Sequence, residues 1–157
     1  MKILLHDQRI DINKANDDEV TPFCIACYQG HVDIVRLLLN DERVDINKAD
    51  NREGYTPFYI ACEKGHIGIV KLLLNHNRVD INKADNRKGY TPFSNACGRG
   101  ELEIIEYILA SGREVNVNTK NNQGETAIDI ARRRGNEEKR NWESEEGCQK
   151  RKIRYGK

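Results

Sequence analysis

The strongest constraint on the fold is an internal repeat of 35 residues. The tripeptide Thr-Pro-Phe begins at Thr21, Thr56 and Thr91, and a weaker copy, Thr-Ala-Ile, begins at Thr126. The same spacing recurs at Gly30, Gly65, Gly100 and Gly135, and at Ala26, Ala61, Ala96 and Ala131. Several residue types that repeat in one register indicate tandem copies of a single structural unit.

Each copy has the pattern of two short helices followed by a loop. Thr56 suits a helix N-cap, Pro57 suits the first turn, and Gly65 suits the position past the helix end, where φ is positive. The next segment, HIGIVKLLLN, predicts a second helix with a broad apolar stripe, and NRVDINKADNRKGY predicts a loop or hairpin. Neither helix can bury its apolar side alone, so the copies must stack.

These residues resemble ankyrin repeats, most closely in TPFYIACEKGHIGIVKLLL and in DIN. The resemblance covers about residues 1–135 and implies an all-α ankyrin-repeat solenoid, in which helix-turn-helix units are joined by hairpin-like loops. We expect a partial repeat at 1–15, repeats that start near 16, 51 and 86, and a partial or capping repeat near 121. The histidine that ankyrin repeats carry after Thr-Pro-Leu is replaced by Cys24, Tyr59, Ser94 and Asp129.

Both ends of the chain depart from the repeat. KILLH, at 2–6, aligns with the end of a second helix, so the chain opens within a repeat and could be part of a longer array. A fourth second helix should lie near 136–144, but its apolar positions hold Lys139, Arg140 and Glu143. We therefore expect 136–157 to be a charged tail, either a polar cap or a frayed end, helical at first and then disordered. Its basic cluster at 150–154 suits a nuclear-import or phosphate-binding patch, or simply a solvated end.

Composition restricts the classes of partner. A formal net charge of +1 gives no overall attraction to nucleic acid or to membranes. No stretch approaches the ~20 apolar residues of a membrane span, and the first residues lack a secretory signal. We expect an intracellular, cytoplasmic monomer, with entry to the nucleus possible through the basic tail.

The cysteines and histidines are predicted to be structural. Cys27, Cys62 and Cys97 stand where ankyrin repeats place a small buried alanine, so they should pack as small apolar residues. Cys24 and Cys27 have the spacing of a metal or redox pair, but no second pair complements them. The resemblance implies that His31 and His66 brace the loop of a neighbouring repeat. With no catalytic motif, we predict no enzyme activity, no cofactor and no metal.

The resemblance implies that a partner protein binds at the finger tips and at the exposed end of each first helix. The expected contact residues are Asp17, Asp18, Tyr28, Arg52, Glu53, Tyr55, Glu63, Lys64, Arg87, Lys88, Tyr90, Arg99, Asn122, Arg133 and Arg134, with Val20, Gln29, Gln123 and Glu125 beside them. We expect Tyr55 and Tyr90 to be the main anchors, because tyrosine favours interface centres. The alternative is that each packs against its own finger. The charges run from acidic to basic along the chain, which predicts an elongated, partly acidic partner segment.

The predicted function is therefore a non-catalytic protein–protein interaction module, a scaffold or adaptor. An alternative is the targeting arm of a larger multidomain enzyme, such as a kinase or ubiquitin ligase. A nucleic-acid binder using the basic end is a further, weaker reading. Asn47 and Asn82 also share the spacing of ankyrin asparagines that an oxygenase hydroxylates. The alternative is that both side chains only hydrogen-bond turn backbone.

Overall fold

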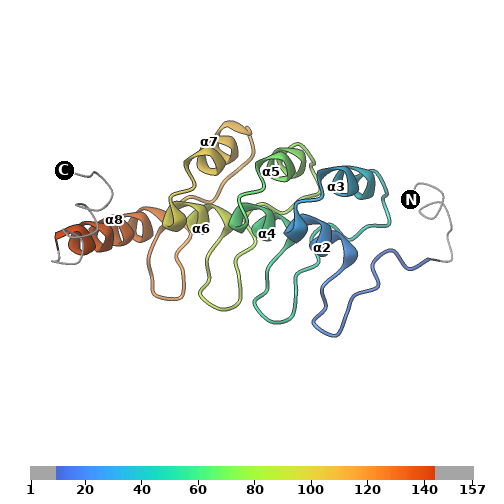
Figure 1. The fold of residues 1–157 in the computed structure, drawn as a ribbon, viewed down its shortest axis with the longest axis horizontal. Coiled ribbons are helices and arrows are strands. Elements are labelled where there is room, and N and C mark those ends of the chain that lie inside the picture. The colour runs from blue at the N-terminus through green and yellow to red at the C-terminus, as the bar shows by residue number, and fades with distance from the viewer. Residues whose placement is uncertain (1–9, 144–157) are drawn as a thin grey trace, which may run out of the picture.

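The computed structural model describes residues 10–143 of the chain, with side chains described for residues 10–135. These residues form an elongated stack of two helical layers, with loops that project from it as fingers (Figure 1). The inner layer contains the first helices α2 (Pro22–Gln29), α4 (Pro57–Glu63) and α6 (Pro92–Arg99). The outer layer contains the second helices α3 (Val32–Leu39), α5 (Ile67–Leu74) and α7 (Leu102–Ala110). The last helix, α8 (Ala127–Glu143), continues the inner layer, and the described range contains no strand.

The first helices begin and end as the sequence predicts. The hydroxyl oxygen of Thr56 accepts a hydrogen bond from the backbone N–H of Tyr59 at 3.1 Å, and Thr21 and Thr91 cap α2 and α6 in the same way. A proline follows each of these caps. Gly65, past the end of α4, has a φ of 71°. The expected solenoid of equivalent, side-by-side helix pairs is confirmed.

One continuous hydrophobic core joins the repeats. Phe58 of α4 and Val70 and Leu73 of α5 are fully buried, and their counterparts in the first repeat, such as Phe23 and Val35, are buried too. The loops also contribute to this core. Val44, Ile46, Val79 and Ile81 lie in the connecting segments and are all buried. The connecting segments are therefore less polar in their packing than the sequence interpretation assumed.

Successive fingers pack closely on one another. The backbone N–H of Asn86 donates to the Glu53 carbonyl at 2.8 Å, and that of Asn122 donates to the Lys88 carbonyl at 2.8 Å. Gly89 has a φ of 73°, and a Cβ there would lie 2.6 Å from Oδ1 of Asn122. A side chain at this position would therefore both strain the backbone and push the next finger away.

An asparagine at the base of each finger joins it to the next. The Asn47 side chain donates from Nδ2 to the Arg78 carbonyl at 2.7 Å and accepts from the Asp80 N–H at 2.8 Å. Asn82 makes the equivalent pair of bonds, to the Glu114 carbonyl and from the Asn116 N–H. Each amide therefore ties its own repeat to the backbone of the following one.

Replacing Asn47 by alanine is expected to lower the free energy of unfolding by about 1–2 kcal/mol, because two inter-repeat hydrogen bonds are lost. Urea unfolding followed by circular dichroism measures this loss. Asn75→Ala is the matched control, since Asn75 is exposed at the end of α5 and its side chain has no assigned hydrogen bond to another described residue. Equal effects of the two substitutions would show that the inter-repeat bonds do not stabilise the stack.

The fourth unit ends differently from the first three. We expected the residues at the position of its second helix, near 136–144, to belong to a charged tail that is helical at first, and up to Glu143 they continue α8 without a break at Gly135. Gly135 does not adopt the positive φ that ends the equivalent helices at Gly30 and Gly100. The physical reason lies in the sequence after Gly135, which carries no apolar stripe that a chain reversal could bury. The expected disordered tail, from residue 144 onward, lies outside the described residues.

Candidate functional site

Most of the predicted contact residues of the first two repeats line one groove, although Asp17, Asp18 and Arg52 do not. This groove has a volume of about 480 Å³ and is formed by α2, α4 and residues of three successive fingers. It is lined by Val20, Cys24, Ile25, Tyr28, Gln29, Asp50, Glu53, Tyr55, Ile60, Glu63, Lys64 and Arg87. Four of these residues were not predicted as contact residues from the sequence: Cys24, Ile25, Asp50 and Ile60.

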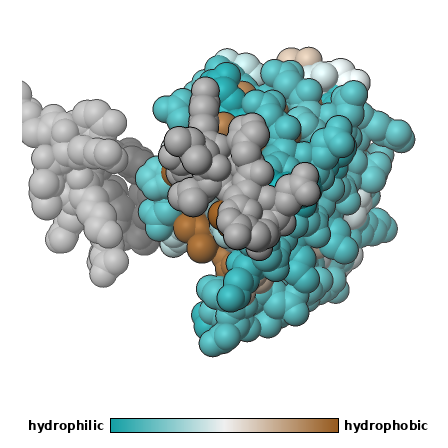
Figure 2. Space-filling view, turned by 90° about the vertical axis from the view of Figure 1, so that its right-hand side faces the viewer, coloured by the Kyte–Doolittle hydropathy of each residue, from teal (hydrophilic) through white to brown (hydrophobic). Residues whose placement is uncertain are grey.

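Two exposed apolar side chains form one wall of the groove. Ile25 is 46% exposed and Tyr28 is 50% exposed, and both lie on α2. Viewed from the α2 end, most of the visible described surface is hydrophilic (Figure 2). Apolar side chains that remain exposed together are therefore exceptions on this surface and favour an interaction site.

The sequence did contain a signal for Ile25. Ile25 and Ile60 occupy the same register position in successive repeats, but Ile60 is buried. The register alone predicts that the side chain lies on the inner face. Whether this side chain is exposed depends on whether a preceding helix of the stack covers it. The periodicity of the sequence does not give this information.

The rim of the groove is charged. Nη1 of Arg87 lies 3.5 Å from Oε2 of Glu53. Lys64 lies over the Tyr28 ring, with Nζ 4.4 Å from the ring centroid. No ion pair with a described residue is assigned to the Glu63 carboxylate.

Tyr55 packs against its neighbour as well as facing the groove. Its ring stacks on the ring of Tyr59, with centroids 4.4 Å apart and an interplanar angle of 14°. Burial raises the pKa of Tyr55, and the nearby carboxylates of Glu63 and Glu53 raise it further. The Tyr55 hydroxyl is therefore neutral and remains a hydrogen-bond donor at neutral pH.

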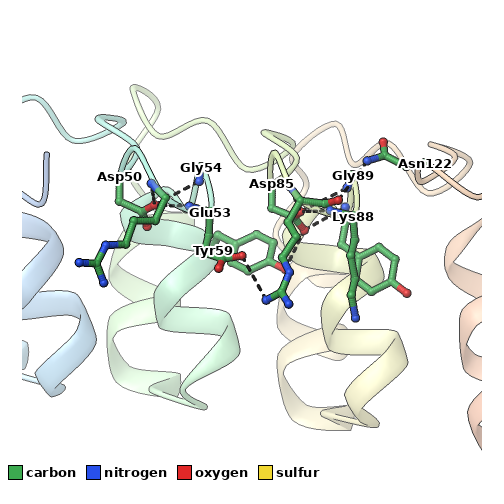
Figure 3. A network of polar contacts seen from close by, with 11 residues as sticks. Asp50, Glu53, Gly54, Tyr59, Asp85, Lys88, Gly89 and Asn122 are labelled. Carbon is green, nitrogen blue, oxygen red and sulfur yellow. Dashed lines mark hydrogen bonds and ion pairs between the residues drawn. The ribbon is translucent and has the colours of Figure 1, made fainter. Parts of the chain in front are cut away.

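Tyr59 also anchors the next finger (Figure 3). Its hydroxyl donates to Oδ2 of the buried Asp85 at 3.1 Å. Oδ1 of Asp85 accepts from the backbone N–H groups of Arg87 and Lys88 at 2.9 and 2.6 Å. The sequence analysis noted Tyr59 only as a departure from the family pattern, and its bond to Asp85 was not foreseen. In the equivalent position, the Cys24 thiol donates to the Lys48 carbonyl at 3.3 Å.

Of the contact residues predicted for the later repeats, Arg87 lines this groove and the others lie outside it. The Tyr90 hydroxyl accepts from Nη2 of Arg133 at 3.2 Å, and Nε of Arg133 lies 2.9 Å from Oε1 of Glu125. Lys88 lies 5.8 Å from the Tyr90 ring centroid. The others bind backbone or a near neighbour: Arg99 pairs with Glu101, Asn122 donates to the Arg87 carbonyl, and Arg134 donates to the Gly98 carbonyl.

Ion pairs also join successive fingers. Nε of Arg52 lies 2.7 Å from Oδ1 of Asp18, one repeat earlier, and Arg87 pairs in the same way with Glu53. Asp17, beside Asp18, is exposed. Because many of the predicted contact charges already have partners within the chain, the attraction for an acidic partner segment is weaker than the sequence alone suggests.

The cysteines pack as expected. Cys27 and Cys62 are fully buried and Cys97 is partly buried, all in or against the core. Burial raises the pKa of each of these thiols, which keeps them protonated. The predicted bracing role of His66 is also confirmed, since Nε2 donates to the Tyr28 carbonyl of the preceding repeat at 3.0 Å.

Hydroxylation of Asn47 and Asn82 stays a prediction. Both side-chain amides are held by the backbone of the following repeat. An oxygenase would therefore need this part of the stack to open locally before it reaches either asparagine. Intact mass of the purified protein, with or without added oxygen, checks this prediction.

Comparison with known proteins agrees with the geometry. A family model described as ankyrin repeats in three copies matches residues 1–85, and one described as ankyrin repeats in many copies matches residues 84–131. A search of curated proteins found no match. No helix within residues 10–143 is long and apolar enough to cross a membrane, and the same residues contain no cluster of three or more His, Cys, Asp or Glu suited to a metal ion. The chain belongs to the ankyrin repeat family, whose members generally serve as protein–protein interaction modules.

Proposed function

We propose that this chain is a non-catalytic scaffold or adaptor that holds a partner protein in the groove between its first two repeats. The observation that carries this proposal is the exposed pair Ile25 and Tyr28, which forms an apolar wall in a groove of about 480 Å³. Apolar and aromatic side chains at the centre of a patch, surrounded by polar groups, are typical of binding surfaces.

The polar groups at the rim give the groove its selectivity. The Glu63 carboxylate and the neutral Tyr55 hydroxyl stand beside the apolar wall. A partner segment with an apolar side chain and a hydrogen-bond donor fits this arrangement. The finger tips farther along the stack, from Lys88 to Arg134, then add contacts at the edge of the interface rather than at its centre.

Tyr28→Ala combined with Ile25→Ser is expected to weaken partner binding at least about tenfold, because both side chains lie at the centre of the proposed interface. The melting temperature should change little, since both side chains are about half exposed. Tyr55→Ala is a less selective test, because it also removes the ring that stacks on Tyr59.

Site-specific photo-crosslinking tests where the partner lies. A photoreactive phenylalanine derivative at position 28 should capture a partner in cell extract, and the same group at the exposed position 36 of the outer helix α3 should not. The groove would be contradicted as the binding site by capture from position 36 alone. It would also be contradicted if capture from position 28 survived Ile25→Ser and an excess of unlabelled chain.

A further inference from the structure

The outer layer of helices ends at α7 within the described residues. The second helices α3, α5 and α7 lie side by side in one row, while α8 continues the inner row past α7 (Figure 1). In the earlier repeats, each second helix is covered by the second helix that follows it. Within residues 10–143 no such helix follows α7.

The exposed fractions of equivalent side chains show which residues remain uncovered where no further second helix follows. Leu74 of α5 is 5% exposed, whereas Leu109, its counterpart on α7, is 54% exposed. Ile67 packs against the core, whereas its counterpart Leu102 is 71% exposed. The same difference is found at the start of α8: Ile128 is 61% exposed, although Phe58 and Phe93, in the same register, are buried.

The open side chains share one face with a carboxylate. Leu102, Glu106 and Leu109 are spaced at i, i+4 and i+7 on α7, so they form one stripe. The segment LEIIEYILA contains no lysine or arginine, and no ion pair with a described residue is assigned to Glu106. We call Leu102, Glu106 and Leu109 the α7 end face.

The preceding repeat indicates what Glu106 can reach. Its counterpart on α5 is Lys71, whose Nζ lies 4.0 Å from the centroid of the Tyr107 ring on α7. A side chain at this register therefore extends to the next second helix in the row. A helix that follows α7 would meet the carboxylate of Glu106 at the position that Tyr107 occupies relative to Lys71.

We propose that the α7 end face binds an amphipathic α-helix of a partner protein that carries a lysine or arginine opposite Glu106. The row of outer helices sets the shape of the occupant, since each member is a short helix packed through its apolar stripe. The acidic face of α7 sets its charge. The chain's own residues 136–143 continue α8 along the inner row, and their sequence, NEEKRNWE, has no apolar stripe that would fill the position.

A stapled helical peptide provides the probe. Its sequence is that of residues 66–75, HIGIVKLLLN, with Leu72→Lys in the peptide, because Leu72 holds the register that Tyr107 occupies on α7. A matched peptide carries Leu72→Glu instead. We expect the full chain to bind the lysine peptide about fivefold more tightly than the glutamate peptide in fluorescence anisotropy. The preference should reverse in a Glu106→Lys chain.

Two variants of the chain locate the site. Leu109→Glu and, separately, Leu102→Gln should abolish binding while circular dichroism stays unchanged, since both side chains are exposed. Tyr28→Ala, in the groove of the first repeats, should leave binding of both peptides unchanged. If Leu109→Glu unfolds the chain, Leu102→Gln still decides the point.

Three outcomes would overturn the proposal. The first is that neither peptide binds, or that binding does not depend on Leu102, Leu109 or Glu106. The second is that the peptide binds only when Ile153→Ser and Tyr155→Ser are introduced, because the chain's own last residues would then be the occupant. The third is that the chain sediments as a dimer and that Leu109→Glu converts this dimer to monomers. The occupant would then be a second copy of this chain.

Discussion

Replacing Asp85 by alanine is expected to lower the free energy of unfolding by about 3–5 kcal/mol, which is a large part of the stability of a domain this size. The carboxylate is only 6% exposed and is shared by two structural elements. Its donors are the backbone N–H groups of Arg87, Lys88, Gly89 and Tyr90 and the hydroxyl of Tyr59. Alanine would leave these donors without an acceptor, and the buried ones could not regain water.

The effect should extend from the finger to the groove. Tyr59 reaches Asp85 from α4 in the preceding repeat, and its ring stacks on Tyr55, which lines the groove. Loss of the carboxylate therefore loosens both the turn at 85–90 and the side of the groove formed by the stacked rings. We expect binding in the groove to weaken even under conditions where Asp85→Ala remains folded.

The preceding finger supplies a matched control. Asp50 has the same register as Asp85, and its Oδ1 accepts from the backbone N–H groups of Arg52, Glu53 and Gly54. Among the described residues no tyrosine hydroxyl donates to it, and it is less buried than Asp85. Urea unfolding should give Asp50→Ala about half the loss of Asp85→Ala, and Tyr59→Phe about 1 kcal/mol. If Asp85→Ala cost no more than Asp50→Ala, the burial and the tyrosine bond would contribute nothing.

The contrast between these two aspartates shows where sequence interpretation reaches its limit. Thr56, Pro57 and Gly65 specify a helix start and end by local geometry alone, so helix positions follow directly from the sequence. The bond from Tyr59 to Asp85 spans two repeats. The spacing of residues in the sequence does not predict which side chain contacts the next repeat. That contact depends on the distance between stacked repeats and on the conformation of the finger.

The fourth repeat shows a related limit of the sequence register. The register aligns Gly135 with the glycines that follow the equivalent helices in earlier repeats. A glycine permits a left-handed residue but does not require one. The reversal at Gly30 and Gly100 is stabilised by an apolar second helix that then packs on the core, and residues 136–143 offer no such stripe. The helix continues past Gly135 because no apolar segment follows that could pack on the core after a chain reversal.

For the candidate site, the resemblance located the region but not its chemistry. It placed Tyr28, Tyr55 and Glu63 at the surface of the inner layer, and these residues do line one groove. It gave no account of which charges pair within the chain, such as Arg52 with Asp18. Ion pairs between side chains 34 residues apart arise only when the fingers stack, so individual contact residues cannot be ranked from their positions in the sequence.

Raising the pH from about 8 to about 10.5 is expected to destabilise the stack by several kcal/mol, chiefly through its buried thiols. Burial raises the pKa of Cys27 and of Cys62 well above the ordinary value of 9.0. Burial, with the adjacent Asp85 carboxylate, likewise raises the pKa of Tyr59 above 10.0. In the unfolded chain these groups lose their protons near their ordinary pKa values, whereas in the folded chain they keep them.

The sign follows from the number of protons bound. Above about pH 9 the folded state binds more protons than the unfolded state, so stability is fully present below this pH and falls as the pH rises. Each buried thiol contributes a slope of about 1.4 kcal/mol per pH unit. Cys27 and Cys62 together should therefore remove about 3 kcal/mol for each unit above about pH 9, and Tyr59 should steepen the loss above about pH 10.

The double substitution Cys27→Ala with Cys62→Ala separates this effect from other alkaline effects. Alanine is the residue that ankyrin repeats place at these positions, so the variant should fold with only a small loss of packing at neutral pH. Between about pH 9 and pH 10 its stability, measured by urea unfolding, should fall less steeply than that of the unsubstituted chain, by about 3 kcal/mol per pH unit. The slope that remains comes from Cys24 and Cys97, whose pKa values burial also raises. Adding Tyr59→Phe should flatten the region above about pH 10. An unchanged slope in the double variant would mean that exposed lysines and tyrosines, not the buried thiols, govern alkaline unfolding.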